Sequence, residues 1–275
     1  MQTTMKDLLS AGADTAIAIS APGRTPLTFA GLRALVDGTL ASLNALGVGR
    51  NDRVGIVLNN GPEMATCFMA CASGTTSAPL NPAYRADEFE FYLSDLNAKA
   101  LIVEKGSTSP AVEVAQKLGV RVVDLVVAEG VAAGGFSLVA RDGGSATPAG
   151  QGGYGAPQDV GMVLHTSGTT SRPKIVPLSV ANLCASASNI RNTLKFTPQD
   201  IGLNIMPLFH IHGLIAGVLA PLSAGAQVFC TPGFNALKFF AWMDEAKPTW
   251  YTAVPTMHQA IVARAKGNTE IIKRN

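Results

Sequence analysis

Short apolar runs alternate with amphipathic segments along most of this sequence, and this alternation limits the possible folds more than any other feature. Strands are expected at RVGIVLNN, ALIVE and VRVVDLVV in the first half, and at VGMVLH, IGLNIM, AQVFCT and WYTAV after residue 160. Strands that alternate with helices are typical of parallel sheets with helices on their faces. The sequence therefore predicts an α/β protein with parallel-rich sheets flanked by helices.

Helical spacing fills the segments between these strands. Helices are expected at 62–71, 86–98, 179–196, 213–224 and 235–247, with a final helix after the last strand. Pro62 occupies a first-turn position, and Asp87 is a candidate cap for the second of these helices. The stretch 128–158 is rich in Gly and Ala and predicts a loop. We therefore expect one α/β subdomain over residues 1–150 and a second over residues 151–275.

Composition excludes several classes of function. The 275 residues are 47% hydrophobic and only 15% charged, with a net charge of +2 and no long Lys/Arg block, so neither nucleic acid nor an anionic membrane is an expected partner. No segment offers the ~18 consecutive apolar residues of a membrane span, and the N-terminus is too weakly patterned for a signal peptide. The four cysteines form no CxxC pair. A soluble, cytoplasmic protein that acts on small molecules is expected.

The stretch LHTSGTTSRPK, residues 164–174, follows a predicted strand and consists mainly of small or hydroxylated residues. Loops at the carboxyl ends of parallel strands are where open α/β sheets bind ligands. Glycine, hydroxyl groups and one lysine suit a phosphate-binding loop, although the spacing differs from the common P-loop. The candidate phosphate ligands are Thr166, Ser167, Gly168, Thr169, Thr170, Ser171 and Lys174. The alternative is a solvated Ser/Thr/Gly turn without a ligand.

Two histidines, His210 and His212, form an H-x-H pattern. On a strand, both side chains would project to one face and could share a metal ion, as in a metal hydrolase. No third ligand stands nearby in sequence, so the metal-binding residues, if any, are unknown. The alternative is a pair of packed, hydrogen-bonded histidines. His165 is expected to be buried at its strand end, and His258 to lie on a helix without a catalytic role.

Several motifs resemble the adenylate-forming, AMP-binding enzymes, which include the acyl-CoA synthetases. TSGTTSRPK followed by KIVPLS is similar to the phosphate loop of that family, and MPLFHIHGL at 206–214 is similar to its next core motif. PLTFAGL, DRVGIVLNNGPEM and APLNPAYRADEFEFYLSDLNAKALIV resemble its entry segments in order and spacing. The resemblance covers nearly the whole chain. Ser171 and Ile175 depart from it, because the family commonly has glycine at both positions.

The resemblance implies an ATP-dependent acid–CoA ligase that uses Mg2+ with ATP and takes coenzyme A as a co-substrate. It implies catalytic roles for His210, beside the acyl carboxylate and the adenylate, and for Lys174 at the phosphates. His212 and Gly213 would line the acyl pocket together with His210. Within the family the chain is most similar to the oxalate-CoA and other small-acid ligases, so a small or dicarboxylic acid is favoured. A medium-chain or aromatic acid stays open.

The resemblance also implies that parts of the family's catalytic machinery lie outside this sequence. An aromatic-Gly-x-Thr-Glu segment, a ribose-binding aspartate and a lid with a catalytic lysine are expected after the motifs quoted above, and none is found. We therefore expect the N-terminal part of a longer ligase, which is inactive alone and needs the C-terminal remainder of the same enzyme as its partner. The alternative is a truncated, non-catalytic module that binds a nucleotide or phosphate.

Overall fold

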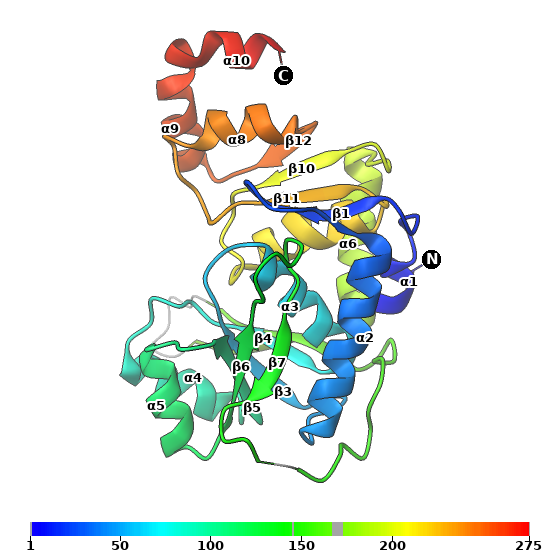
Figure 1. The fold of residues 1–275 in the computed structure, drawn as a ribbon, viewed down its shortest axis with the longest axis vertical. Helices are drawn as coiled ribbons and strands as arrows, with labels where there is room; N and C mark the ends of the chain where they lie inside the picture. The colour runs from blue at the N-terminus through cyan, green and yellow to red at the C-terminus, as the bar shows by residue number, and fades with distance from the viewer. Residues whose placement is uncertain (1, 145, 167–172, 275) are drawn as a thin grey trace.

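Two β-sheets joined by helices make up the fold, which the computed structural model describes for residues 2–144, 146–166 and 173–274 (Figure 1). The α/β class with parallel-rich sheets flanked by helices, expected from the sequence, is confirmed. Among the residues that the structure describes, none of the helices combines the length and apolar character that crossing a bilayer requires.

The larger sheet has seven strands in the order β7-β6-β5-β3-β4-β8-β9. Its inner strands run parallel, whereas β7 and β9 pair antiparallel with β6 and β8 at the two edges. The bounds are β3 Arg53–Val57, β4 Thr76–Pro79, β5 Ala100–Glu104, β6 Arg121–Val126, β7 Ser137–Ala140, β8 Val160–His165 and β9 Ile175–Ser179. The sheet thus takes strands from both sides of residue 150, and the subdomain division expected there stays a prediction.

The smaller sheet has five strands in the order β12-β10-β11-β1-β2, and it joins the start of the chain to its last third. β1 pairs parallel with β11, so that Ile19 lies opposite Val228, while β2 pairs antiparallel with β1. The bounds are β1 Ile17–Ser20, β2 Leu27–Thr28, β10 Ile201–Asn204, β11 Gln227–Cys230 and β12 Trp250–Thr252.

Helices cover both sheets, and one of them lies between the two. The bounds are α1 Met5–Leu9, α2 Phe29–Ala45, α3 Pro62–Gly74, α4 Ala86–Asp95, α5 Pro110–Lys117, α6 Val180–Leu194, a π-helix at His212–Leu219, α7 Ala220–Leu222, α8 Phe239–Ala246, α9 Pro255–Ala265, a 3-10 turn at Lys266–Asn268 and α10 Thr269–Arg274. Helix α3 contacts β4 and β8 of the larger sheet and β11 of the smaller one (Figure 1). All its residues from Met64 to Gly74 are buried, because Ala, Cys, Ser and Gly let neighbouring elements approach on every side. All four cysteines are free and buried.

The structure departs from the sequence expectations at several points. No strand was expected in KIVPLS, yet Ile175–Ser179 form β9 although the segment contains Pro177, since an edge strand tolerates a residue without an N–H group. The stretch 128–158, expected as a loop, includes strand β7. Helix α4 is not capped by Asp87: Arg85 is its N-cap residue, and the backbone N–H of Arg85 donates to Oε2 of Glu88 at 2.9 Å.

The segment 146–158 connects the sheet edge at β7 to β8 and lies against the ends of α2 and α3. Its backbone forms hydrogen bonds of 2.7 to 2.8 Å with Asn44, Arg50 and Ser73. Asp159 directly follows the segment. Its carboxylate accepts hydrogen bonds from Nε of Arg50 at 2.6 Å and from Nδ2 of Asn51 at 3.0 Å. The Arg50 hydrogen bond is the largest cause of the lowered pKa of Asp159. A Gly-rich connection is thereby fixed next to β8.

Candidate active site

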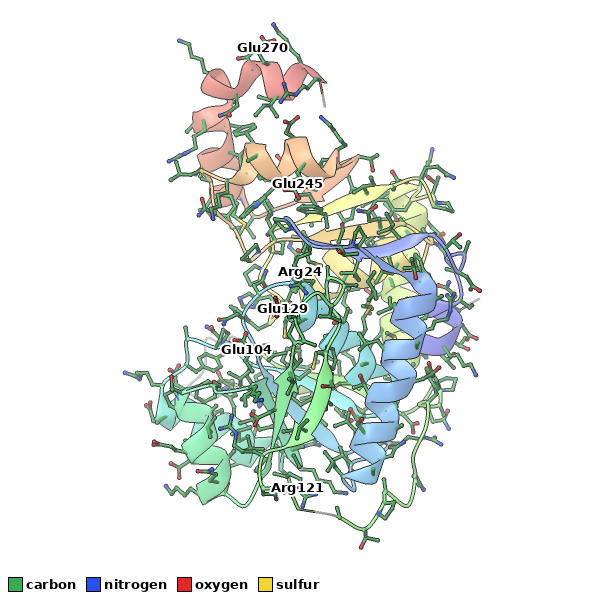
Figure 2. The ribbon with its side chains drawn as sticks, in the orientation of Figure 1. Arg24, Glu104, Arg121, Glu129, Glu245 and Glu270 are labelled. Atoms are coloured by element: carbon green, nitrogen blue, oxygen red, sulfur yellow. The ribbon has the colours of Figure 1, made fainter. Side chains whose placement is uncertain are left out.

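The carboxyl ends of the larger sheet's parallel strands face the smaller sheet. Figure 2 labels one residue at each end of the strands. Arg121, which begins β6, lies at the far end of the molecule, and Glu104, which ends β5, lies near its middle. Strand β8 runs parallel to β4 and ends at the same middle edge. The predicted phosphate loop therefore begins where the two sheets meet, as expected for a ligand site of an open α/β sheet.

The neck of this loop is closed by two hydrogen bonds between Thr166 and Lys174. The backbone N–H of Thr166 donates to the carbonyl of Lys174 at 3.0 Å, and the N–H of Lys174 donates to Oγ1 of Thr166 at 3.2 Å. Antiparallel pairing of β8 with β9 continues from this neck. The other candidate phosphate ligands, Ser167, Gly168, Thr169, Thr170 and Ser171, lie outside the described residues, and their role stays a prediction.

His210 lies in a tight turn between β10 and the π-helix. The N–H of His210 donates to the carbonyl of Pro207 at 3.3 Å, and its own carbonyl accepts from the N–H of Leu214 at 3.1 Å. The Phe209 and His210 rings are 4.5 Å apart between centroids. The residue is exposed, yet partial desolvation of the ring lowers the pKa of His210. A neutral imidazole, which can donate one N–H, is therefore favoured near pH 7.

Two adjoining cavities, of about 140 and 380 Å³, bring the phosphate-loop neck and this turn together. Both are lined by Leu164, His165, Thr166, Phe209 and His210. Tyr84 and Tyr92 also line the smaller cavity, whereas apolar side chains from β9 and the turn also line the larger one. Thr166 and His210, predicted from separate motifs, thus share one site. Lys174 is not among the residues that line either cavity.

His165 forms a fixed wall of this site. Its side chain is 7% exposed, its Nε2 lies 3.0 Å from Oδ2 of Asp95, and its ring packs edge-on against Tyr92 at 4.7 Å. Tyr84 stacks on Tyr92 at 4.8 Å. The burial expected for His165 is confirmed, but these partners were not predicted. Tyr92 and Asp95 are three residues apart on α4, a spacing that places both on one helix face, and this was the available signal.

His212 and Gly213 begin the π-helix behind the turn. Nε2 of His212 lies 2.7 Å from Oγ1 of Thr252, at the end of β12. The H-x-H pattern is therefore not on a strand, and the described ranges contain no group of three or more His, Cys, Asp or Glu side chains placed to hold a metal ion. A Cβ atom on Gly213 would collide with the carbonyl oxygen of Pro207. Glycine thus allows the helix to pack directly onto the turn that carries His210.

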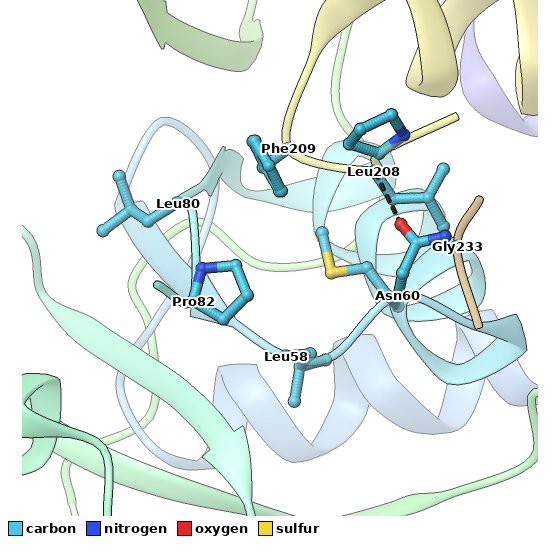
Figure 3. A pocket seen from close by; sticks show the side chains of 9 residues that line it. Leu58, Asn60, Leu80, Pro82, Leu208, Phe209 and Gly233 are labelled. Atoms are coloured by element: carbon cyan, nitrogen blue, oxygen red, sulfur yellow. Dashed lines mark hydrogen bonds between the residues drawn. The ribbon is translucent and has the colours of Figure 1, made fainter. Parts of the chain in front are cut away.

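A third cavity, of about 200 Å³, lies beneath the same turn (Figure 3). Asn60, three residues after the end of β3 at Val57, lines it together with Pro207, Leu208 and Phe209. The Asn60 side chain hydrogen-bonds to both the turn and the end of β11. Asn60 lies in the family-like segment DRVGIVLNNGPEM, but that resemblance did not identify it as a site residue.

Comparisons with known proteins agree with this geometry. A sequence model of the family described as "AMP-binding enzyme" matches residues 10–273. An oxalate–CoA ligase of Arabidopsis thaliana is 40% identical over 257 residues, which cover 92% of this chain and 50% of that protein. An oxalate–CoA ligase of Saccharomyces cerevisiae is 34% identical over 239 residues, 80% of this chain and 44% of that protein. The ATP-bound crystal structure of MatB from Rhodopseudomonas palustris superposes with a TM-score of 0.77 at 25% identity, covering 95% of this chain and 51% of that one. The chain spans about half the length of these relatives.

Proposed function

The chain belongs to the AMP-binding enzyme family, and from that premise we propose that it forms the phosphate- and carboxylate-binding part of an ATP-dependent acid–CoA ligase. In the proposed reaction a carboxylate oxygen attacks the α-phosphorus of ATP, which gives an acyl-adenylate and pyrophosphate. The thiol of coenzyme A then attacks the acyl carbon, loses its proton, and displaces AMP. The observation that carries the proposal is that Thr166, which is hydrogen-bonded to Lys174 at the loop neck, lines the same two cavities as His210.

The loop residues bind the β- and γ-phosphates of ATP in this proposal. Backbone N–H groups and the hydroxyls of Thr166, Ser167, Thr169, Thr170 and Ser171 donate to phosphate oxygens, while Gly168 permits a close approach. Lys174 supplies a positive charge that offsets the phosphates. Mg2+ accompanies ATP, and we assign it no protein ligand.

His210 acts on the acid in this proposal. A neutral imidazole donates one N–H to the substrate carboxylate and stabilises it next to the α-phosphate as charge moves between them. His212 and Gly213, at the start of the π-helix that follows the turn, are assigned to the acyl side of the pocket in this proposal, although neither lines the two cavities at His210. A small or dicarboxylic acid is the proposed substrate class, because both curated relatives quoted above are named for oxalate.

Calorimetric titration of the 275-residue chain with ATP and with pyrophosphate tests the proposal. We expect binding that Lys174→Ala weakens about 10- to 150-fold, since a hydrogen bond to a charged group contributes about 1.5–3 kcal/mol. Lys266→Ala, an exposed lysine after α9, is the matched control and should leave the affinity unchanged. Equal affinities of the Lys174→Ala variant and the unaltered chain would remove Lys174 from the site, and no binding by the unaltered chain would contradict the phosphate-binding role.

A further inference from the structure

The side chain of Asn60 links the two sheets directly beneath the turn that carries His210. Its Oδ1 accepts from the backbone N–H of Leu208 at 2.7 Å (Figure 3). Its Nδ2 donates to the carbonyl of Thr231 at 3.2 Å. We propose that Asn60 is a positioning residue that holds the 207–210 turn, and through it the His210 ring, at the edge of the larger sheet. The catalytic meaning of that position rests on the proposed function, whereas the positioning itself does not.

An amide side chain suits this place because it offers an acceptor and a donor a short distance apart. The neighbouring Asn59 shows the contrast: its backbone N–H and its Nδ2 both donate to the carboxylate of Glu104, which ends β5 of the same sheet. Asn59 therefore binds within the larger sheet, and Asn60 reaches across to the smaller one. The two adjacent asparagines form a matched pair for experiment.

The turn needs this support because the space below it is not filled. The cavity of about 200 Å³ separates Pro207, Leu208 and Phe209 from the side chains of Leu58 and Met64. Leu208 is 2% exposed, so its N–H would be buried without an acceptor if Asn60 were absent, which is costly. The turn's own hydrogen bond, from the N–H of His210 to the carbonyl of Pro207, is long at 3.3 Å.

The second hydrogen bond of Asn60 anchors it to the strand ends of the smaller sheet. Thr231 is fully buried directly after β11, and its Oγ1 donates to the carbonyl of Asn204, the last residue of β10, at 2.9 Å. Asn60 thus joins the end of β3 to the ends of β10 and β11. The turn begins three residues after the end of β10, and Thr166 directly follows β8 of the larger sheet, so a displacement of this junction moves His210 relative to Thr166.

Amide exchange and histidine NMR on the 275-residue chain test the proposal without ATP or acid. In Asn60→Ala we expect the Leu208 amide to exchange about tenfold faster and the His210 ring resonances to shift, because the acceptor is gone. Asn60→Asp keeps the acceptor and should retain protection at Leu208, although it loses the donor to Thr231. Asn59→Ala should leave both signals unchanged.

Three outcomes would overturn the positioning role. The first is that the Leu208 amide exchange rate and the His210 ring resonances are unchanged in Asn60→Ala. The second is that Asn59→Ala changes both signals in the same way. The third is that all amides of Asn60→Ala exchange uniformly faster and that Asn60→Asp shows the same faster exchange. If Asn60→Ala does not fold, Asn60→Asp decides alone, since loss of Leu208 protection in that folded variant contradicts the proposal. None of these outcomes depends on phosphate binding, so they are separable from a failure of the Lys174 titration.

Discussion

The absence of a side chain at Gly213 allows the π-helix to pack against the 207–210 turn. We predict that Gly213→Ala lowers the free energy of unfolding by about 1–3 kcal/mol, because the added Cβ must displace the carbonyl of Pro207. Urea denaturation followed by circular dichroism measures this change. Gly38→Ala is the control: it lies inside α2 with open space around its Cβ position, so alanine should be neutral or stabilising there. Equal stability of both variants would contradict the close packing.

The pKa of His210 gives a second prediction at the residue scale. Desolvation lowers this pKa in the folded state, so the unfolded chain binds the proton more readily and stability falls as pH drops from the ordinary histidine pKa towards the lowered one. An NMR titration should place the His210 midpoint below that of a free histidine peptide, and His210→Asn should remove this contribution to the pH dependence. A midpoint at or above the free value would show that the ring is not desolvated.

Individual site residues differ in how far the sequence could reveal them. Thr166, Lys174 and His210 stand in local motifs whose residue types suggest their chemistry. Asn60 and Asp95 lie in segments that resemble the family, but their residue types do not suggest their roles, because their partners lie 148 and 70 residues away and only the folded sheets bring them together. The spacing of Tyr92 and Asp95 indicates a shared helix face, but it does not identify His165 as the partner.

At the scale of elements, the connection between β7 and β8 depends on Asp159. Its carboxylate accepts hydrogen bonds from Arg50, Asn51 and the N–H of Ala156. We predict that Asp159→Asn lowers the free energy of unfolding by about 2–3 kcal/mol at pH 7, since hydrogen bonds to a charged group are lost. Because the pKa of Asp159 is lowered, its contribution is present above the ordinary Asp pKa and disappears as pH falls towards the lowered value.

Urea denaturation at several pH values measures the Asp159 contribution. The variant should show a flatter loss of stability in acid than the unaltered chain. Asp87→Asn provides the control, because the Arg85–Asp87 pair has side chains 77% and 72% exposed and contributes little. Parallel pH profiles of the Asp159→Asn variant and the unaltered chain would contradict the prediction.

Strands and helices with clear periodicity were predictable, and the exceptions have physical reasons. The π-helix was expected as an ordinary helix, because periodicity over eight residues does not separate the two hydrogen-bonding patterns. Pro177 concealed β9, which tolerates it at the sheet edge. Strand β7 has no fully buried residue and interrupts a Gly-rich stretch, so its pattern was weak.

At the scale of the whole molecule, the chain spans about half the length of the relatives quoted above. We predict that the 275-residue chain shows no acid-dependent exchange of labelled pyrophosphate into ATP, even where it binds ATP, because the family's later motifs are not in this sequence. Scintillation counting of labelled ATP with and without oxalate measures this. Exchange above the rate of a Lys174→Ala control would mean that the chain alone completes the adenylation step.

The fold class could be predicted from the sequence, but the division into two sheets could not. Alternating strands and helices specify parallel pairing without stating which strands are neighbours. All strands of the larger sheet lie between β1 and β11 in the sequence, yet β1 pairs with β11. Hydrophobic periodicity does not predict such a connection.

That pairing also orders events while the chain is being made. Ile19 leaves the ribosome long before its partner Val228, and at about 5–20 residues per second the delay is about 10–40 s. During that time the strands of the larger sheet emerge and can pair with one another. The N-terminal strand meanwhile has only the short β2 beside it, so the nascent protein carries an unpaired strand edge until its last third is synthesised.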